Sequence, residues 1–251
     1  MLADQRRQLI RREIADRGSV VAADLAARLG VSEDTIRRDL RELARSGACA
    51  RVYGGALAPA PAAGPIGARV ASDVAAKLRL ARAAVPLLAP GSTVFIDAGS
   101  TNLAIAHAIP QEAELTVATN AVDVAAALAG HAGVELIVLG GRFARDLGAC
   151  LGAEALRQIG QIAADIFVLG SCGVDAGRGA TAFDPAEAEV KRAMAAARRA
   201  VLVAATTAKL GTAAPFRVAA PEAIRHLVVE ADAPADRLDQ FAHLGAAIHR
   251  A

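Results

Sequence analysis

Small polar residues suited to binding an anion recur in the C-terminal part of the chain, each time directly after an apolar run. The first two groups are Asp97-Ala-Gly-Ser-Thr-Asn102 and Thr119-Asn120. Glycine allows close backbone approach, and hydroxyls together with the free N–H groups that open a helix can hold an oxyanion such as a phosphate. Each group alone is as typical of a turn or helix cap as of a binding site.

Further groups of this kind follow later in the chain. Gly140-Gly141 comes first, and Gly173-Val-Asp175 then supplies a carboxylate suited to the hydroxyls of a sugar. Glu187 and Lys191 are four residues apart on a predicted helix and therefore share a face, as many surface ion pairs also do. Lys209 follows another apolar run.

The lysines are informative because the chain uses arginine for almost every cation. Of 28 basic residues only three are lysines, namely Lys77, Lys191 and Lys209. A lysine ammonium is a compact point charge, which the planar fork of arginine does not replace. We therefore expect Lys191 and Lys209 to contact a ligand, and Lys77, in an amphipathic helical segment, to lie on the surface.

The elements that position these residues alternate between strands and helices. Apolar runs predict strands at 93–97, 115–119, 134–139, 165–169, 200–205 and 226–230, and helical periodicity predicts helices at 68–88, 121–128 and 186–198 and one ending near 109. Strands apolar on both faces indicate a mainly parallel sheet covered by helices. Ligands of such sheets bind beyond the carboxyl ends of the strands, where all of these polar groups fall. The sequence thus predicts a pocket for a small polyhydroxylated anion, such as a phosphorylated sugar.

Several other chemistries are disfavoured. The sequence has neither a GxxxxGK[ST] phosphate loop nor a GxGxxG fingerprint, its five histidines are scattered, and Cys49, Cys150 and Cys172 lack metal-ligand spacing. We therefore expect no cofactor, no metal and no catalytic residue. A chain without an apolar run of about 18 residues and without the apolar core of a signal peptide is expected to be cytoplasmic, with reduced thiols and no membrane partner.

The N-terminal residues follow a different pattern, with two short helices on either side of Gly30-Val-Ser32. Their apolar stripes are Val21, Leu25 and Leu29, and Ile36, Leu40 and Leu43. Gly30 suits the end of the first helix, and Ser32 suits the N-cap of the second. A turn this short leaves one arginine-bearing face of the second helix free, as in a helix-turn-helix that reads the DNA major groove.

The flanking residues strengthen this interpretation. A further helix is predicted over about 5–16, and Arg51-Val-Tyr-Gly-Gly-Ala56 is typical of a hairpin tip, or wing. Residues 1–57 hold 11 Arg and 8 acidic residues, a net charge of +3, whereas residues 58–251 hold 17 basic and 18 acidic residues, a net charge of −1. A basic head on a nearly neutral body suits nucleic-acid binding by the head. The candidate DNA-contacting residues are Ser32, Glu33, Thr35, Arg37, Arg38, Arg41, Arg51 and Tyr53.

The chain is therefore expected to contain two domains. Residues 1–57 form a small all-α winged helix-turn-helix domain, and residues 68–251 form an α/β domain with a mainly parallel sheet. A linker rich in proline and alanine, residues 58–67, joins them.

These motifs together resemble the DeoR family. Val31-Ser-Glu-Asp-Thr-Ile-Arg-Arg-Asp-Leu40 and the wing are similar to its winged helix-turn-helix, and the strand-end groups are similar to its effector domain. The resemblance covers nearly the whole chain, and it implies a ribose-5-phosphate-isomerase-like fold for the second domain. It also implies a bacterial transcriptional regulator, commonly a repressor of sugar metabolism that a sugar phosphate releases from its operator.

The resemblance also implies roles for individual residues. Gly99, Ser100, Thr101, Thr119 and Asn120 would hold the phosphate, Asp175, Glu187 and Lys191 would contact the sugar, and Lys209 would lie near the anion. All effector-binding candidates are Asp97, Gly99, Ser100, Thr101, Asn102, Thr119, Asn120, Gly140, Gly141, Gly173, Asp175, Glu187, Lys191 and Lys209. Two positions depart from the family pattern. Ser100 replaces the first Thr of the usual Asp-x-Gly-Thr-Thr, a milder change that keeps the hydroxyl. Thr206 replaces an Asp three residues before the lysine, and we expect the loss of this carboxylate to relax sugar contacts or change the ligand.

The leading hypothesis is a homo-oligomeric repressor, a dimer or tetramer, that binds double-stranded operator DNA and is released by a phosphorylated sugar. One alternative is an activator that depends on its effector. The other is a sugar-phosphate isomerase-like enzyme with a DNA-binding head, in which Asp175, Glu187 and Lys191 act as acid and base groups. The lack of a poised histidine or carboxylate pair disfavours the enzyme.

Overall fold

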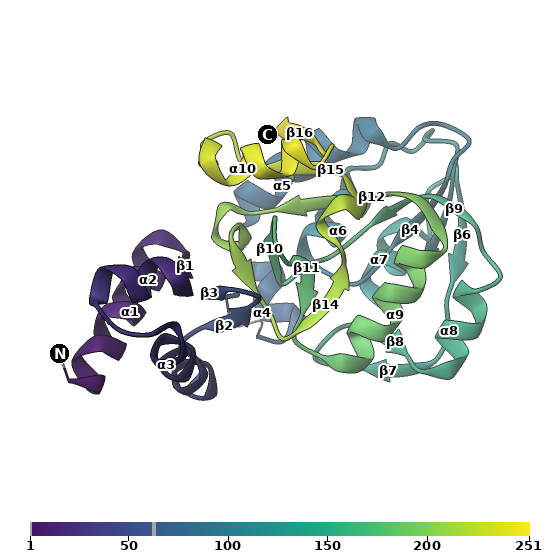
Figure 1. The fold of residues 1–251 in the computed structure, drawn as a ribbon. Coiled ribbons are helices and arrows are strands. Elements are labelled where there is room, and N and C mark those ends of the chain that lie inside the picture. The colour runs from purple at the N-terminus through teal and green to yellow at the C-terminus, as the bar shows by residue number, and fades with distance from the viewer. Residues whose placement is uncertain (1, 62–63) are drawn as a thin grey trace.

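The computed structural model describes residues 2–61 and 64–251, which form a small N-terminal domain beside a larger α/β domain (Figure 1). Each domain has its own apolar core. Ile10, Leu25 and Ile36 are fully buried in the first, and Phe95 and Phe167 in the second, where their rings meet edge to face. Of the expected linker, residues 62–63 lie outside the described residues.

The N-terminal domain contains the predicted helix-turn-helix and wing. Its elements are α1 (Ala3–Arg17), β1 (Ser19–Val21), α2 (Ala22–Leu29), α3 (Glu33–Arg45), β2 (Ala50–Val52) and β3 (Gly55–Pro59). Gly30 ends α2 with a left-handed φ of 64°, and the Ser32 hydroxyl caps α3 by accepting a hydrogen bond from the Thr35 N–H at 3.3 Å. Strands β2 and β3 form the antiparallel wing hairpin.

The domain is not entirely helical, since β1 and β2 both pair with β3 as antiparallel strands of a four-stranded sheet. The assignment of Val21 to the apolar stripe of a helix is therefore wrong. Val21 ends β1, opposite Gly55, and its side chain is 53% exposed. Sheet pairing with a strand more than thirty residues away decides this conformation, and helical periodicity does not report it.

A buried ion pair joins α1 to α3, the second helix of the helix-turn-helix. Arg6 of α1 donates from Nε to Asp39 of α3 at 2.5 Å, and both side chains are at most 10% exposed. The two charges satisfy one another in a site that excludes water, so the removal of either one leaves the other uncompensated.

The α/β domain is built on a seven-stranded sheet in which every pair is parallel. Its strands, in spatial order, are β16 (Ala247–Arg250), β15 (Ile224–Val229), β12 (Arg198–Ala205), β9 (Ala164–Val168), β4 (Thr93–Ile96), β5 (Leu115–Thr119) and β6 (Val134–Val138). All six predicted strands are present, within about two residues at each end, because their Val, Ile and Leu runs are buried on both faces. Strand β16 was not predicted from the sequence.

The strand order reverses direction between β4 and β9. From β4 the chain runs outward through α6 (Ser100–Ala108), β5, α7 (Val122–Leu128) and β6, and from β9 it runs the other way through α9 (Pro185–Ala196) to β12. Right-handed crossovers therefore place α6 and α7 on one face of the sheet and α9 on the other (Figure 1). On the first face α5 (Val74–Ala84) packs against α6, and on the second α8 (Ala153–Ile159) packs against α9. The carboxyl ends of β4 and β9 meet at this switch point, where ligands of such sheets bind.

The helix predicted over 68–88 is not continuous. It is divided into α4 (Ile66–Ala71), α5 and a 3₁₀ turn at Val85–Leu87. The break lies at Ser72 and Asp73, and Asp73 has a left-handed φ of 48°. The helical periodicity continues across this corner and so does not reveal it.

Shorter elements complete the fold. They are the hairpin of β7 (Arg142–Ala144) and β8 (Ala149–Leu151), the small sheet of β10 (Gly173–Asp175), β11 (Gly179–Ala182) and β14 (Phe216–Ala219), the 3₁₀ turns Thr207–Lys209 and Pro221–Ala223, α10 (Ala235–His243) and β13 (Thr212–Ala213). Strand β13 pairs in parallel with Ala58 and Pro59 of β3. The wing strand therefore continues into the expected linker and joins the two domains. In the described part of the chain, no helix is long and apolar enough to cross a membrane.

We predict that Asp39→Ala destabilises the N-terminal domain by about 3 kcal/mol, because Arg6 is left buried without its counter-charge. Hydrogen exchange of the α1 and α3 amides measures this loss of stability in the N-terminal domain separately from the rest of the chain. Asp34→Ala, at an exposed position of the same helix, is the matched control and should cost about 0.5 kcal/mol. Equal exchange rates in the two variants would contradict a stabilising role for the pair.

Candidate functional site

The exposed face of α3 carries the arginines expected to meet DNA. Arg37 donates to Glu33 at 2.7 Å, and Arg41 donates from Nε to the carbonyl of Arg37 at 3.2 Å, so both side chains are held along the helix. Arg38 is also exposed and makes no ion pair or side-chain hydrogen bond with any described residue. Its full charge is therefore accessible to a phosphate.

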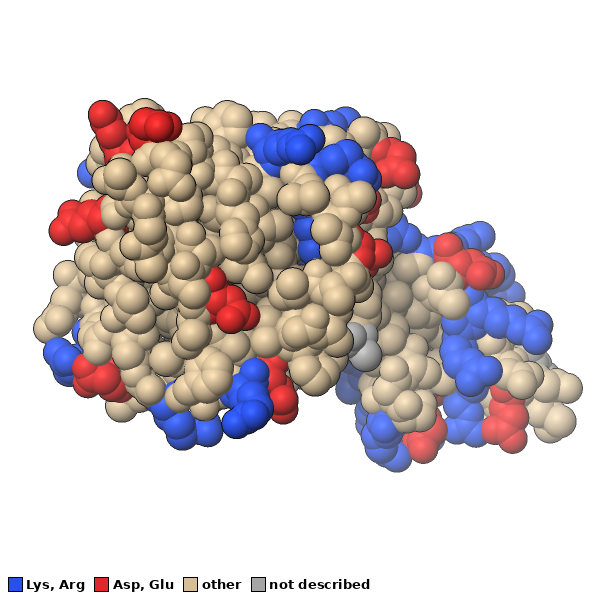
Figure 2. Space-filling model, turned by 180° about the vertical axis from the view of Figure 1, so that it is seen from behind, with Lys and Arg blue, Asp and Glu red and all other residues tan. Residues whose placement is uncertain are grey.

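The remaining DNA-contact candidates lie at the two ends of the same domain. Ser32 is exposed and Thr35 half-buried at the N-terminus of α3, while Arg51 and Tyr53 are exposed on the wing, with Tyr53 at its tip. Figure 2 shows many arginine side chains, with acidic ones among them, over this domain, whereas much of the larger domain is uncharged on that face.

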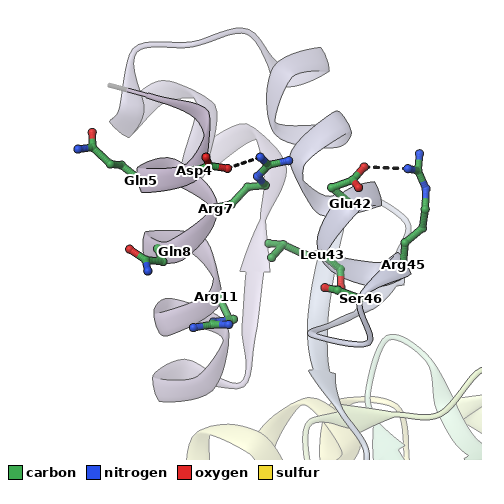
Figure 3. Close-up of a pocket in the computed structure, with 9 residues that line it drawn as sticks. All are labelled: Asp4, Gln5, Arg7, Gln8, Arg11, Glu42, Leu43, Arg45 and Ser46. Carbon is green, nitrogen blue, oxygen red and sulfur yellow. Dashed lines mark hydrogen bonds and ion pairs between the residues drawn. The ribbon is translucent and has the colours of Figure 1, made fainter.

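A hollow of about 630 Å³ lies in the same domain, between α1 and α3 (Figure 3). Two of its three arginines are neutralised locally, since Arg7 pairs with Asp4 and Arg45 pairs with Glu42. Arg11 also lines it, but these cations do not converge on one point, as Figure 3 shows. This hollow therefore lacks the electrostatics of a small-anion site.

In the larger domain, Asp97 lies at the switch point and is fully buried. Its Oδ1 accepts hydrogen bonds from the Asn102 side chain and from the Gly170 N–H, both at 2.7 Å, and its Oδ2 accepts one from Lys191 Nζ at 2.5 Å. Gly170 is required here, because a Cβ at this position would lie 2.7 Å from the Ala98 carbonyl oxygen. Burial raises the pKa of Asp97 to about 6, although Lys191 opposes the shift.

Lys191 reaches this carboxylate from α9 and is itself 2% exposed. It also donates to the Gly170 carbonyl at 2.6 Å and pairs with Glu187 at 3.3 Å. Burial lowers the pKa of Lys191, but the charges of Asp97 and Glu187 outweigh this effect and hold the pKa above its usual value. The ammonium is therefore charged and fully compensated, so it ties α9 to the ends of β4 and β9.

A cavity of about 140 Å³ lies beyond these strand ends. Its lining residues are Pro61, Arg69, Ser72, Asp73, Lys77, Ser100, Ser171, Cys172, Thr206, Ala208 and Lys209. A narrow adjoining cleft is lined by Gly99, Thr101, Asn102 and Glu187, among others. The Thr101 and Ser171 hydroxyl oxygens are buried without a hydrogen-bond partner in the described structure. They stand beside the first turn of α6, whose N–H groups have no acceptor within the helix.

Positive charge dominates this cavity. Arg69, Lys77 and Lys209 line it, against a single carboxylate, Asp73. Lys209 donates to the Ser171 carbonyl at 2.8 Å, and burial lowers its pKa to about 8, an effect to which Arg69 and Lys77 add. A cavity of this charge with unpartnered hydroxyls suits a small anion.

Eight of the fourteen predicted effector residues line neither this cavity nor this cleft, among them Asp97 and Lys191, which pair with each other. The Thr119 hydroxyl accepts from the Ala121 N–H, and the Asn120 side chain donates to the Cys150 carbonyl. The Gly140 N–H donates to Gln158, and Gly141 lies against the Leu151 carbonyl. The contacts of Asn120 and Gly141 hold β8 against the sheet, whereas those of Thr119 and Gly140 are made to Ala121 and to α8.

Gly173 and Asp175 lie elsewhere as well. Gly173 packs on the Thr212 carbonyl, and Asp175 accepts hydrogen bonds from the Gly177 and Arg178 N–H groups. Asp175 lines a separate hollow between the domains, together with Arg17 of α1 and Arg237 of α10. Burial raises the pKa of Asp175.

Several lining residues, above all Arg69, Asp73 and Lys77, were not predicted from the sequence. Lys77 was expected on the surface, but it is 6% exposed and donates to the carbonyls of Arg69 and Ser72. Its rarity as a lysine was the only signal that pointed to it. Arg69 gave no signal, since it is one arginine among 25.

Comparison with known proteins identifies both domains. Residues 6–61 match the DeoR-like helix-turn-helix domain, and residues 72–231 match the DeoR C terminal sensor domain. The chain belongs to the DeoR family of transcriptional regulators. Membership decides against the isomerase-like enzyme, because the DeoR family and the relatives below are DNA-binding regulators.

Two relatives of this DeoR-family chain are similar along most of their length. The putative aga operon transcriptional repressor of Escherichia coli O157:H7 is 32% identical over 97% of this chain and 91% of its own. The glycerol-3-phosphate regulon repressor of Escherichia coli K12 is 34% identical over 84% of each. Among solved structures, ribose 5-phosphate isomerase A from Methanocaldococcus jannaschii covers 55% of each chain, with 14% identity and a TM-score of 0.42.

We predict that Asp97→Asn destabilises this DeoR-family chain by about 3 kcal/mol, because Lys191 then loses the nearer of its two counter-charges in a dry site. Urea unfolding followed through the sensor domain measures the loss. Glu189→Gln, an exposed change of the same type on α9, is the control. Combining Asp97→Asn with Lys191→Met should cost less than the sum of the two single changes, and strict additivity would show that the pair is not coupled.

Proposed function

We propose that this chain represses a carbohydrate-metabolism operon in the cytoplasm and leaves its operator when a phosphorylated sugar binds the sensor domain. The proposal rests chiefly on the cation-lined cavity at the carboxyl ends of β4, β9 and β12. Two relatives are named as repressors of an aga operon and of a glycerol-3-phosphate regulon. These names support an operon for the metabolism of a carbohydrate or polyol.

In this proposal, the phosphate lies at the first turn of α6. Ser100, Thr101 and Ser171 would donate to its oxygens, and Lys209 would supply the charge. Glu187, which borders the adjoining cleft, would accept hydrogen bonds from the sugar. Thr206 lines the cavity without a carboxylate, so it would bind a sugar hydroxyl less strongly than the usual Asp of the family does.

The other candidates have indirect roles in this proposal. Asp97 and Lys191 shape the strand ends, and Gly173 packs β10 against β13. Asn120 and Gly141 hold β8, while Thr119 and Gly140 order the loops that follow β5 and β6. Asp175 would act at the contact between the domains. None of these residues needs to contact the ligand for the site to form.

On the DNA side, we propose that the recognition helices of a homo-oligomer enter successive major grooves, with Arg38 on a phosphate and the N-terminal end of α3 toward the bases. The ligand moves the population of chains off the DNA only if the DNA-bound arrangement has the lower affinity for that ligand.

A thermal-shift screen of the full-length chain against sugar phosphates, glycerol 3-phosphate and their unphosphorylated parents tests the function. A ligand that binds the folded state alone raises the melting temperature by mass action. We expect one ester to raise it while the parent compound does not, and the same ester to release the chain from duplex DNA containing its operator. A response to no ester would refute the phosphorylated effector, and stronger DNA binding with the ester would indicate an activator.

The response should also depend on pH in a defined direction. Lys209 must be protonated to bind an anion, and its pKa of about 8 means that it loses the proton as the pH rises through that value. The rise in melting temperature caused by the ester should therefore be large at pH 7 and decline above about pH 8. A shift that stays constant up to pH 10 would exclude Lys209 from the anion contact.

We predict that Arg38→Ala weakens binding to all duplex sequences and lowers the slope of log K against log salt by about 1, because one phosphate contact is lost. Fluorescence anisotropy at several salt concentrations measures both quantities. Arg45→Ala, at an exposed position near the other end of α3, is the control. An unchanged slope for Arg38→Ala would remove Arg38 from the phosphate contacts.

A further inference from the structure

The cavity has two walls of different origin. One wall comes from the sheet edge and carries Ser100, Ser171 and Lys209. The other comes from the chain that leads from β3 into the sensor domain and carries Pro61, Arg69 of α4 and Lys77 of α5. Arg69 lies between the two matched family regions, which end at residue 61 and begin again at residue 72.

The cations of these walls differ from Lys191 in their compensation. Lys191 has two carboxylates, Asp97 and Glu187. Among the described residues, Lys77 donates only to carbonyls and a hydroxyl of the chain corner, and Lys209 only to the Ser171 carbonyl. The Arg69 Nε is buried without a hydrogen-bond partner in the described structure. A buried guanidinium N–H without an acceptor is costly, and an anion in the cavity would satisfy it.

Lys77 holds Arg69 in place. Its ammonium donates to the Arg69 carbonyl and to the Ser72 carbonyl, the latter at 2.6 Å, and so fixes the corner between α4 and α5. The start of α4 is fixed separately, since the Ile66 N–H donates to the Asp146 carbonyl at 2.9 Å. The guanidinium is thus presented to the cavity by an anchored helix.

Both walls are attached to the wing strand. Pro61 follows β3 by two residues, and Lys209 precedes β13 by three. Strands β3 and β13 pair in parallel through Ala58 and Thr212, and the Ala60 N–H donates to the Ala213 carbonyl at 3.1 Å. A ligand that draws the walls together therefore acts on the segments that flank the β3–β13 junction.

We propose that Arg69 binds the anionic group of the effector together with Lys209, so that the chain leading from β3 into the sensor domain forms half of the site and transmits its occupancy to the wing. This inference rests on the proposed function, because it names the residue that would sense the phosphorylated ligand and the route to the DNA-binding domain.

Calorimetric titration of the full-length chain with inorganic phosphate tests the proposal. Arg69→Gln and Lys209→Gln should each weaken phosphate binding about tenfold or more, which is the usual loss for a hydrogen bond to a charged group. Arg82→Gln, the same change at an exposed position of α5, should bind phosphate like the wild type. Arg69→Gln should keep wild-type affinity for duplex DNA without phosphate, which shows that it folds.

Hydrogen exchange separates transmission from binding. Saturating phosphate should slow exchange at the amides of α4 and β3 in the wild type and in Arg82→Gln, but not in Arg69→Gln. If Arg69→Gln binds phosphate like the wild type while Lys209→Gln does not, the role of Arg69 is overturned and the proposed function stands. If neither phosphate nor any ester binds the wild type, both are overturned.

Discussion

The buried contact between Asp97 and Lys191 is the interaction on which the sensor domain depends. A carboxylate and an ammonium in a dry site are stable only when both are paired and hydrogen-bonded, and here each also binds the backbone of Gly170. This requirement brings the ends of β4 and β9, the first turn of α6 and the middle of α9 together at one point. The cleft and the cavity exist beside that point because the strand order reverses there.

The contact with Asp97 distinguishes Lys191 from the cations that line the cavity. Lys191 is neutralised inside the fold, so it stabilises the frame, whereas Arg69, Lys77 and Lys209 face a cavity with one carboxylate. Charge left uncompensated in a partly buried site is costly, and proteins retain it where a ligand or partner completes the pairing. The division follows from the tertiary placement of carboxylates, since all four side chains carry the same charge.

A short parallel pairing joins the recognition module to the sensor. Strand β3 belongs to the wing hairpin and also pairs with β13. Strand β13 follows directly after the turn that carries Lys209. The connection is therefore a hydrogen-bonded junction and not only a flexible tether. A shared strand gives two sites a common element whose position both can bias, which is the physical condition for coupling between them.

The sequence alone determined the features that depend on local patterns. Gly30 and Ser32 ended and began helices where backbone freedom and a capping hydroxyl predict, and continuous apolar runs identified six strands of a parallel sheet, because burial on both faces leaves no polar alternation. Only the tertiary structure decided the site. Asp97 and Lys191 are 94 residues apart, Asp175 lies at another hollow, and Arg69 enters the cavity from α4, where the sequence predicted only the start of a long helix. Contacts between distant residues depend on how the layers pack and where the chain turns, and no local periodicity records either.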